Sequence, residues 1–338
     1  MSSTTLPGLD LTDLSRHLRT VASWPDGDIR ARLIAGGRSN LTYLLEVDDR
    51  RFVLRRPPLG HILSTAHDMA REHRVLTSLR DTDVPIPDTI HLCTDELVIG
   101  APFYVMDYVP GRVFQTARDL ADLGSESTRA LVLELVRMLA RLHAVPIEGP
   151  GLRELGRPEG FLRRQVDRWQ RQLEASATRD LAGAADLTLA LRDRVPEPDA
   201  ATLLHGDYRL DNVLVEDGRI TAVLDWEMAT LGDPLTDLAL LVSRNHDVCG
   251  EDGMMFDTSL APGFPASTEM IEEYARASCR DVSRLPWFIA LAHFKRAAIL
   301  EGLHHRHVQG LTVGDGFEHA GDLVLPAIRA GLESIENA

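Results

Sequence analysis

Three polar residues stand at defined spacings in the middle of the chain: Asp207, Asn212 and Asp225. The segments 213–215 and 220–224 are rich in β-branched residues and enclose an Asp-Gly pair, a pattern typical of a tight β-hairpin. Such a hairpin should bring Asn212, before its first strand, close to Asp225, after its second. Asp207 comes on the loop just before. The sequence therefore predicts one cluster that combines a carboxylate base with oxygen ligands for a metal ion.

This combination suits phosphoryl transfer. The reaction needs a carboxylate that accepts or orients the proton of a hydroxyl, and oxygen ligands that hold Mg²⁺ against nucleotide phosphates. Kinase catalytic loops carry His-Arg-Asp, four further residues, an Asn and later a metal-binding Asp. Here His205-Gly206-Asp207 precedes four residues and then Asn212, so the spacing from Asp to Asn is the same. Turn-capping carboxylates and a strand-edge asparagine are the alternative, which the joint spacing disfavours.

The string HGDYRLDNVLV at 205–215, with VLDWEMATLGDPLTDLA at 223–239, resembles the aminoglycoside phosphotransferase family of the protein-kinase-like superfamily. It is similar in particular to the branch related to the kinase-like region of certain multidomain acyl-CoA dehydrogenases. The resemblance implies an α+β, two-lobed protein-kinase-like fold. A small N-lobe with an antiparallel sheet would span residues 1–108, and a mostly helical C-lobe residues 109–338, with the nucleotide in the cleft between them.

The resemblance also implies roles for single residues in the C-lobe. Asp207 would be the catalytic base, and Asn212 and Asp225 would be the Mg²⁺ ligands. Gly206 replaces the arginine that reads a phosphorylated activation loop in protein kinases, so this mode of regulation is not expected. Asp237 would brace the backbone of the catalytic loop.

In the N-lobe, Arg55 stands where the superfamily carries a phosphate-binding lysine, and Glu72 on the following helix would be its partner. Arginine presents a planar fork and lysine a point charge, so the replacement leaves phosphate geometry and rate open. Glu72 could instead face solvent and pair with Arg71 or Arg74.

A glycine-rich turn at 36–40 separates two predicted strands, 29–35 and 41–47. Backbone N–H groups in such a turn can cover nucleotide phosphates, and Ser39 and Asn40 are the candidate contacts. Paired glycines also form ordinary hairpins, and the position upstream of the catalytic loop favours the phosphate role.

The run PFYVMDYVPG at 102–111 resembles the last strand of the N-lobe entering the hinge. Backbone groups of Asp107, Tyr108 and Val109 would then bind the adenine edge. Val105 and Met106 would line the adenine pocket, although an ordinary core strand would have the same composition.

The remaining pattern is mainly helical, with a long helix expected within 118–143 and further helices over 161–177, 181–195, 286–307 and 315–336. The polar faces of the second and third are rich in arginine. Glu301 shares a helix face with His304 or His305, so a metal site there is conceivable. Histidines near a helix C-terminus more commonly interact with the helix dipole.

Composition excludes several classes of function. A net charge of −15 over 338 residues argues against binding nucleic acid, which requires a basic surface. No basic N-terminal segment precedes an apolar core, and no apolar run reaches about 18 residues, so neither a signal peptide nor a membrane span is expected. Three scattered cysteines without a C-x-x-C motif fit a reducing compartment. We therefore expect a cytoplasmic protein, and its oligomeric state stays open.

These features predict an ATP- or GTP-dependent and Mg²⁺-dependent phosphotransferase that acts on a hydroxyl of a small molecule. A hydroxyacyl-CoA or a related hydroxylated metabolite is the first candidate acceptor, because of the dehydrogenase-related branch and the arginine-rich helices. An aminoglycoside is the alternative acceptor. A non-catalytic nucleotide-binding pseudokinase is the alternative class, suggested by Arg55.

Overall fold

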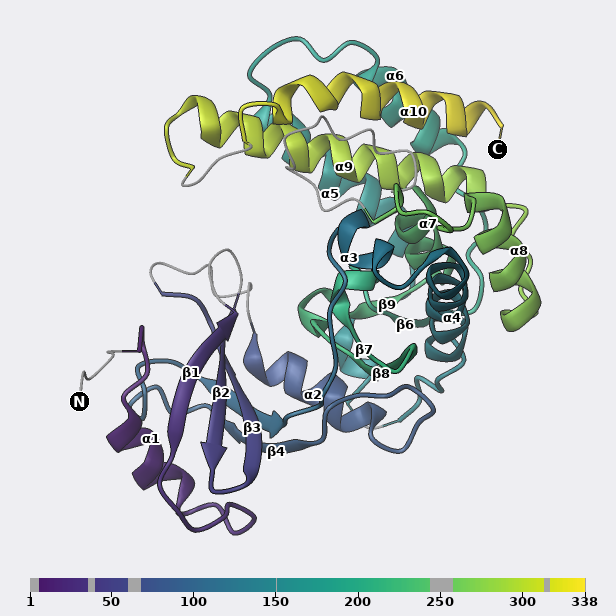
Figure 1. Ribbon diagram of the computed structural model, residues 1–338. Helices are drawn as coiled ribbons and strands as arrows, with labels where there is room; N and C mark the ends of the chain where they lie inside the picture. Colours follow the sequence, from purple (N-terminus) through teal and green to yellow (C-terminus); the bar gives the residue numbers. More distant parts are fainter. Residues whose placement is uncertain are drawn as a thin grey trace.

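The chain forms two lobes, an N-terminal one built on a β-sheet and a larger helical one (Figure 1). The structure is a computed structural model that describes residues 6–35, 40–59, 68–149, 151–243, 258–312 and 317–337. The two-lobed α+β architecture expected from the sequence is confirmed. The boundary near residue 108 stays a prediction. Within the described ranges, every helix is too short or too polar to cross a membrane.

The N-lobe sheet has five antiparallel strands in the order β1-β2-β3-β5-β4. The strands are β1 (Arg30–Ala35), β2 (Leu41–Val47), β3 (Arg50–Arg56), β4 (Thr89–Cys93) and β5 (Phe103–Asp107). Two helices, α1 (Leu11–Leu18) and α2 (Met69–Leu79), lie on opposite sides of the sheet (Figure 1). Asp68 caps the first turn of α2 by accepting from the backbone N–H of Arg71 at 3.0 Å.

Each face of this sheet contributes to a different hydrophobic core. Along β5, Phe103 and Val105 pack in the cluster that includes α1, whereas Tyr104 and Met106 belong to the cluster that continues into the helical lobe. Alternate residues of a strand point to opposite faces. The expectation that Val105 and Met106 line one pocket together is therefore wrong, and only Met106 lies on the side of α2.

The C-lobe is built around α9, a long helix that packs against α5, α7 and α10. Its helices are α3 (Ala117–Ala121), α4 (Ser125–Leu142), α5 (Phe161–Ser176), α6 (Ala184–Asp193), α7 (Leu235–Ser243), α8 (Ser267–Ser278), α9 (Leu285–Val308) and α10 (Val324–Glu336). The long helix expected within 118–143 is present as α4, and Gly124, with a φ of 79° outside the helical region, separates it from the short α3. The last helix begins at Val324, after a 3₁₀ turn, and not near residue 315.

Two short antiparallel pairs carry the central motif. Strands β6 (Thr202–Leu204) and β9 (Thr230–Gly232) form one, and β7 (Val213–Glu216) and β8 (Arg219–Val223) form the other. The predicted hairpin is thus present. Asp217 and Gly218 at its turn have φ values of 50° and 74°, as a tight turn with two left-handed residues requires.

Candidate active site

The catalytic-type loop follows β6 and holds Asp207 against Asn212. The side-chain amide of Asn212 donates to the backbone carbonyl of Asp207 at 2.8 Å and to its carboxylate at 3.2 Å. The backbone N–H of Leu224 donates to the Asn212 carbonyl at 2.8 Å, which closes the hairpin beside Asp225. The structure therefore brings together the residues whose spacing suggested a site.

Asp237 fixes the backbone of this loop from α7. Its buried carboxylate accepts from the N–H groups of His205 at 2.7 Å and Gly206 at 2.9 Å. Burial alone would raise the pKa of Asp237, but hydrogen bonds and charges from His143 and His205 lower it below its ordinary value. The predicted bracing contact is present, and the carboxylate is kept ionised to accept from both N–H groups.

Gly206 has a conformation that no other residue would adopt without strain. Its φ is 83°, and a Cβ atom there would lie 2.6 Å from the carbonyl oxygen of Met228. Glycine tolerates positive φ and close backbone approach. This explains in physical terms why the loop carries glycine where protein kinases have arginine.

Arg55 lies between two carboxylates that come from different lobes. Its Nη2 donates to Asp225 Oδ1 at 2.9 Å, and its Nη1 lies 3.4 Å from Glu72 Oε2. Glu72 also accepts from the Asn40 amide at 2.8 Å and the Tyr104 hydroxyl at 2.9 Å. Glu72 is only 1% exposed, so the alternative of a solvent-facing glutamate is wrong. The proposed phosphate clamp is therefore a buried arrangement held by two ion pairs and two hydrogen bonds.

Glu227 is a further acidic group that the sequence reasoning missed. Burial, followed by the negative charges of Asp225 and Glu72, raises the pKa of Glu227 to about 7. Carboxylate oxygens of Glu72, Asp225 and Glu227 lie within 4.8 Å of one another. The available signal was the position of Glu227, two residues after a proposed metal ligand.

This donor set fits a magnesium ion. Mg²⁺ prefers carboxylate and carbonyl oxygens, and Asp225 and Glu227 supply the former. The amide nitrogen of Asn212 donates to Asp207, which leaves its amide oxygen as the atom with which Asn212 could bind the cation. The clustered negative charge around Arg55 is consistent with a cation site.

The residues expected to contact the nucleotide differ in how well their positions fit that role. Met106 is buried on the α2 side of the sheet. The N–H groups of Asp107 and Tyr108 already donate to the carbonyls of Asp88 at 2.9 Å and Arg51 at 3.2 Å. Among the hinge N–H groups expected to bind adenine, the prediction therefore narrows to that of Val109.

The glycine-rich turn is only partly described. Ser39 lies outside the described residues. Asn40 is 2% exposed and positions Glu72 through its amide, so its phosphate contact stays a prediction and a supporting role for Glu72 is added.

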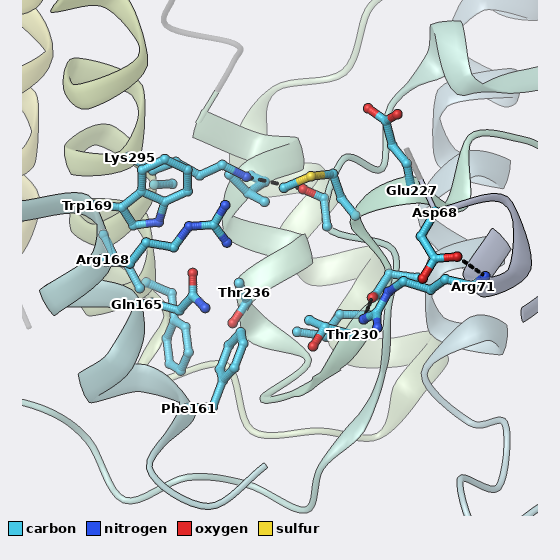
Figure 2. A pocket seen from close by; sticks show the side chains of 18 residues that line it. Asp68, Arg71, Phe161, Gln165, Arg168, Trp169, Glu227, Thr230, Thr236 and Lys295 are labelled. Carbon is cyan, nitrogen blue, oxygen red and sulfur yellow. Dashed lines mark hydrogen bonds between the residues drawn. The ribbon is translucent and has the colours of Figure 1, made fainter. Parts of the chain in front are cut away.

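A cavity of about 450 Å³ opens beside the catalytic loop, lined mostly by the C-lobe and on one side by the start of α2. Figure 2 shows Trp169, Arg168 and Lys295 on one side of it, and Asp68, Arg71 and Glu227 on the other. The Arg168 guanidinium and the Lys295 ammonium lie 5.0 and 5.5 Å from the Trp169 ring centre. Lys295 also donates to the carbonyl of Gly206 at 3.2 Å.

The cavity therefore has a cationic, aromatic end that adjoins the catalytic loop. The sequence indicated an arginine-rich face on this segment of the chain but did not connect α5 with the site. No local motif connects Arg168 with Lys295, because α5 and α9 meet only in the folded chain. Arg209 was also missed. Its Nε lies 3.8 Å from Asp207 Oδ2, and its position two residues after the proposed base was the available signal.

The metal site considered on α9 does not form. Glu301 accepts from the backbone N–H and the hydroxyl of Thr178, at 2.9 and 2.7 Å. His305 contacts the Ser176 carbonyl at 3.1 Å. Within the described ranges, the groups of His, Cys, Asp and Glu close enough to share an ion lie elsewhere.

Comparisons with known proteins match most of this chain to one family model and to a region of larger curated proteins. A model described as the phosphotransferase enzyme family matches residues 30–288. Acyl-CoA dehydrogenase family member 11 of Gallus gallus is 35% identical over 332 residues, which cover 95% of this chain and 42% of that protein. The chain thus spans less than half the length of this curated relative.

Solved structures show the same fold. A structure from Ralstonia eutropha, provisionally assigned as an aminoglycoside phosphotransferase, has a TM-score of 0.85 at 30% identity and covers 97% of this chain and 99% of its own. The aminoglycoside phosphotransferase APH(4)-Ia in complex with ADP and hygromycin B has a TM-score of 0.61 at 16% identity, with 96% and 98% covered. At that identity the likeness concerns the fold alone.

Proposed function

The chain belongs to the phosphotransferase enzyme family, with a protein-kinase-like fold, and we propose that it transfers the γ-phosphoryl group of ATP or GTP to a hydroxyl of a small molecule. The family resemblance found in the sequence is thereby confirmed. The observation that carries the proposal is the position of Asp207, held by Asn212 next to the Asp225 hairpin end. The proposed base, the proposed metal ligands and the cavity for an acceptor would then lie next to one another.

Asp207 would accept or orient the proton of the acceptor hydroxyl as that oxygen attacks the phosphorus. Asp225, Glu227 and Asn212 would hold Mg²⁺, which would supply positive charge to offset that of the nucleotide phosphates. Arg55, oriented by Glu72, would contact the phosphates. A guanidinium can bind two phosphate oxygens side by side, so the absence of the usual lysine does not remove this role.

We place the acceptor in the cavity beside the loop. A hydroxylated anion, such as a hydroxyacyl-CoA or its free acid, is the acceptor we propose. Arg168 and Lys295 offer two cations at the end where Trp169 supplies an apolar surface. The relatedness to a protein named as an acyl-CoA dehydrogenase family member is consistent with such an acceptor. The opposite side, with Asp68 and Glu227, is the feature that favours a cationic aminoglycoside instead.

The first experiment measures thermal shifts with ATP and GTP, with and without Mg²⁺, on the wild type and on Asp225→Ala. Ligand at about 100 times its Kd should stabilise the protein by about 2.7 kcal/mol. We expect a Mg²⁺-dependent shift that the variant loses. A shift that needs no Mg²⁺, with no phosphate transfer to any acceptor, would support a non-catalytic nucleotide-binding protein.

The second experiment tests the acceptor with a panel of hydroxyacyl-CoA esters, free hydroxy acids, uncharged alcohols and aminoglycosides. Phosphate transfer to the anionic members is the expected result. Transfer to aminoglycosides alone would overturn the acceptor assignment and leave the phosphotransferase assignment standing.

A further inference from the structure

Three side chains with nitrogen and sulfur donors meet in the N-lobe, away from the nucleotide cleft. His17 on α1 and His91 on β4 have their Nε2 atoms 2.9 Å apart. Ligand atoms of His17, His91 and Cys93 all lie within 4.8 Å of one another. We propose that this cluster is a binding site for a transition-metal ion, and specifically for Zn²⁺.

The fold brings these residues together from two elements far apart in the sequence. His91 and Cys93 are two positions apart on β4, so their side chains project from the same face of the strand. Cys93 belongs to the hydrophobic cluster under α1. His17, on the last turn of α1, lies above that face, with its ring 5.9 Å from that of Phe103. The donors are therefore held by packed secondary structure and not by a loop.

The donor set has the chemistry of zinc. Thiolate and imidazole ligands select Zn²⁺ over Mg²⁺ or Ca²⁺, which take oxygen. Bond lengths of about 2.0–2.1 Å to nitrogen and about 2.3 Å to sulfur place tetrahedral donors about 3.3–3.6 Å apart. The two imidazoles would need to separate by a few tenths of an ångström, which a side-chain rotation supplies. Water would complete the fourth position.

Binding would replace two interactions that the cluster makes now. The Cys93 thiol contacts the Asp95 carbonyl at 3.6 Å, and one histidine donates to the other. On binding, the thiol proton would be released to solvent and both Nε2 atoms would turn to the ion, as ligand deprotonation requires. Without a metal, the two rings pack on Phe103 and Cys93 packs in the hydrophobic cluster, so metal binding itself has to be measured to separate the two arrangements.

The test uses the full chain after removal of metals with a chelator. Co²⁺, added as a spectroscopic probe for Zn²⁺, should give a thiolate-to-metal charge-transfer band at one equivalent. Cys93→Ser should abolish this band. His17→Gln and His91→Gln should each weaken Zn²⁺ binding in calorimetry more than tenfold, since even outer-shell partners contribute tenfold or more.

A double variant, His305→Gln with His307→Gln, is the control, because it removes the other histidine-rich segment and leaves the cluster intact. It should retain the band and the affinity, and Zn²⁺ should raise its Tm as it does for the wild type. No charge-transfer band in the wild type would overturn the proposal. So would a band that survives Cys93→Ser, or binding that only the double variant loses. Circular dichroism of each variant identifies any loss that results from unfolding.

Discussion

The guanidinium of Arg55 lies 2.9 Å from the carboxylate of Asp225, a residue 170 positions further along the chain. This contact joins the N-lobe sheet to the hairpin end at which we place the metal. The proposed phosphate clamp and the proposed metal site therefore form one charge network, and a substitution in either should change the electrostatics of both.

Arg55→Met should destabilise the protein because it leaves the buried carboxyl of Glu72 without its cation. Removing one partner of a buried ion pair typically costs about 3–5 kcal/mol. Urea denaturation would measure the loss in free energy of unfolding. Arg55→Lys keeps the charge and should lose less. Equal stability of Arg55→Met and the wild type would show that the network contributes little.

Asp207→Asn should reduce kcat by about 10²–10⁴-fold, the usual contribution of a general base. Nucleotide binding should persist, because the amide keeps the shape of the side chain. Steady-state transfer assays and thermal shifts measure the two effects. Glu227→Gln is the matched comparison, since Glu227 lines the cavity with a pKa of about 7. Turnover that survives in Asp207→Asn would overturn the assignment of the base, and loss of Mg²⁺-dependent nucleotide binding in Glu227→Gln would assign Glu227 to the metal and not to the base.

Glu227 should make stability depend on pH. Its pKa is raised to about 7 in the folded protein, from its ordinary value of 4.5. Between these values the folded state binds more protons than the unfolded state, so stability falls as pH rises through this window. Glu227→Gln lacks this penalty, and its advantage over the wild type in urea denaturation should grow from about pH 5 to about pH 8. A pH-independent difference would contradict the raised pKa.

Gly206→Ala should be more destabilising than Gly218→Ala. Both glycines have positive φ, 83° and 74°, so both variants pay for a left-handed alanine, roughly 1 kcal/mol. A Cβ at Gly206 would also meet the Met228 carbonyl, whereas a Cβ at Gly218 has no atom within 4 Å. Urea denaturation measures the loss in free energy of unfolding for both variants, and the difference between them gives the cost of the steric clash beyond backbone strain. Equal losses would show that the loop relaxes to avoid the clash.

Lys295→Met and Arg168→Met should raise the KM for an anionic acceptor. A hydrogen bond to a charged group contributes about 1.5–3 kcal/mol, which corresponds to roughly 10–150-fold in KM. The KM for an uncharged alcohol acceptor should change little, and this comparison is the internal control. Equal effects on both acceptors would indicate that the two cations only support the Trp169 packing.

The central motif could be predicted from the sequence because its information is local. The spacing from Asp207 to Asn212 and the Asp-Gly turn lie in one short segment, the catalytic loop and the hairpin that follows it, and the hydrogen bonds follow from that geometry. The pairing of Arg55 with Glu72 was expected only through family resemblance, since it joins a strand and a helix.

What could not be predicted depends on contacts between distant elements. The pKa of Glu227 results from burial and from two carboxylates that other segments bring near. The cavity wall with Arg168 and Lys295 exists only because α5 packs on α9. The assignment of the residues of β5 to its two faces also required the observed sheet. A fully buried strand has no alternation of polar and apolar residues from which its faces could be distinguished.

Lys295 is the only lysine in the sequence, and its ammonium lies at the cavity, against the catalytic loop. Amine-directed reagents therefore have a single side-chain target here, next to the place where we expect the acceptor. Protection of this amine from such a reagent by bound acceptor would report acceptor binding without any engineered residue. An aldehyde-bearing acceptor analogue could be fixed there by reductive amination and its site read by mass spectrometry.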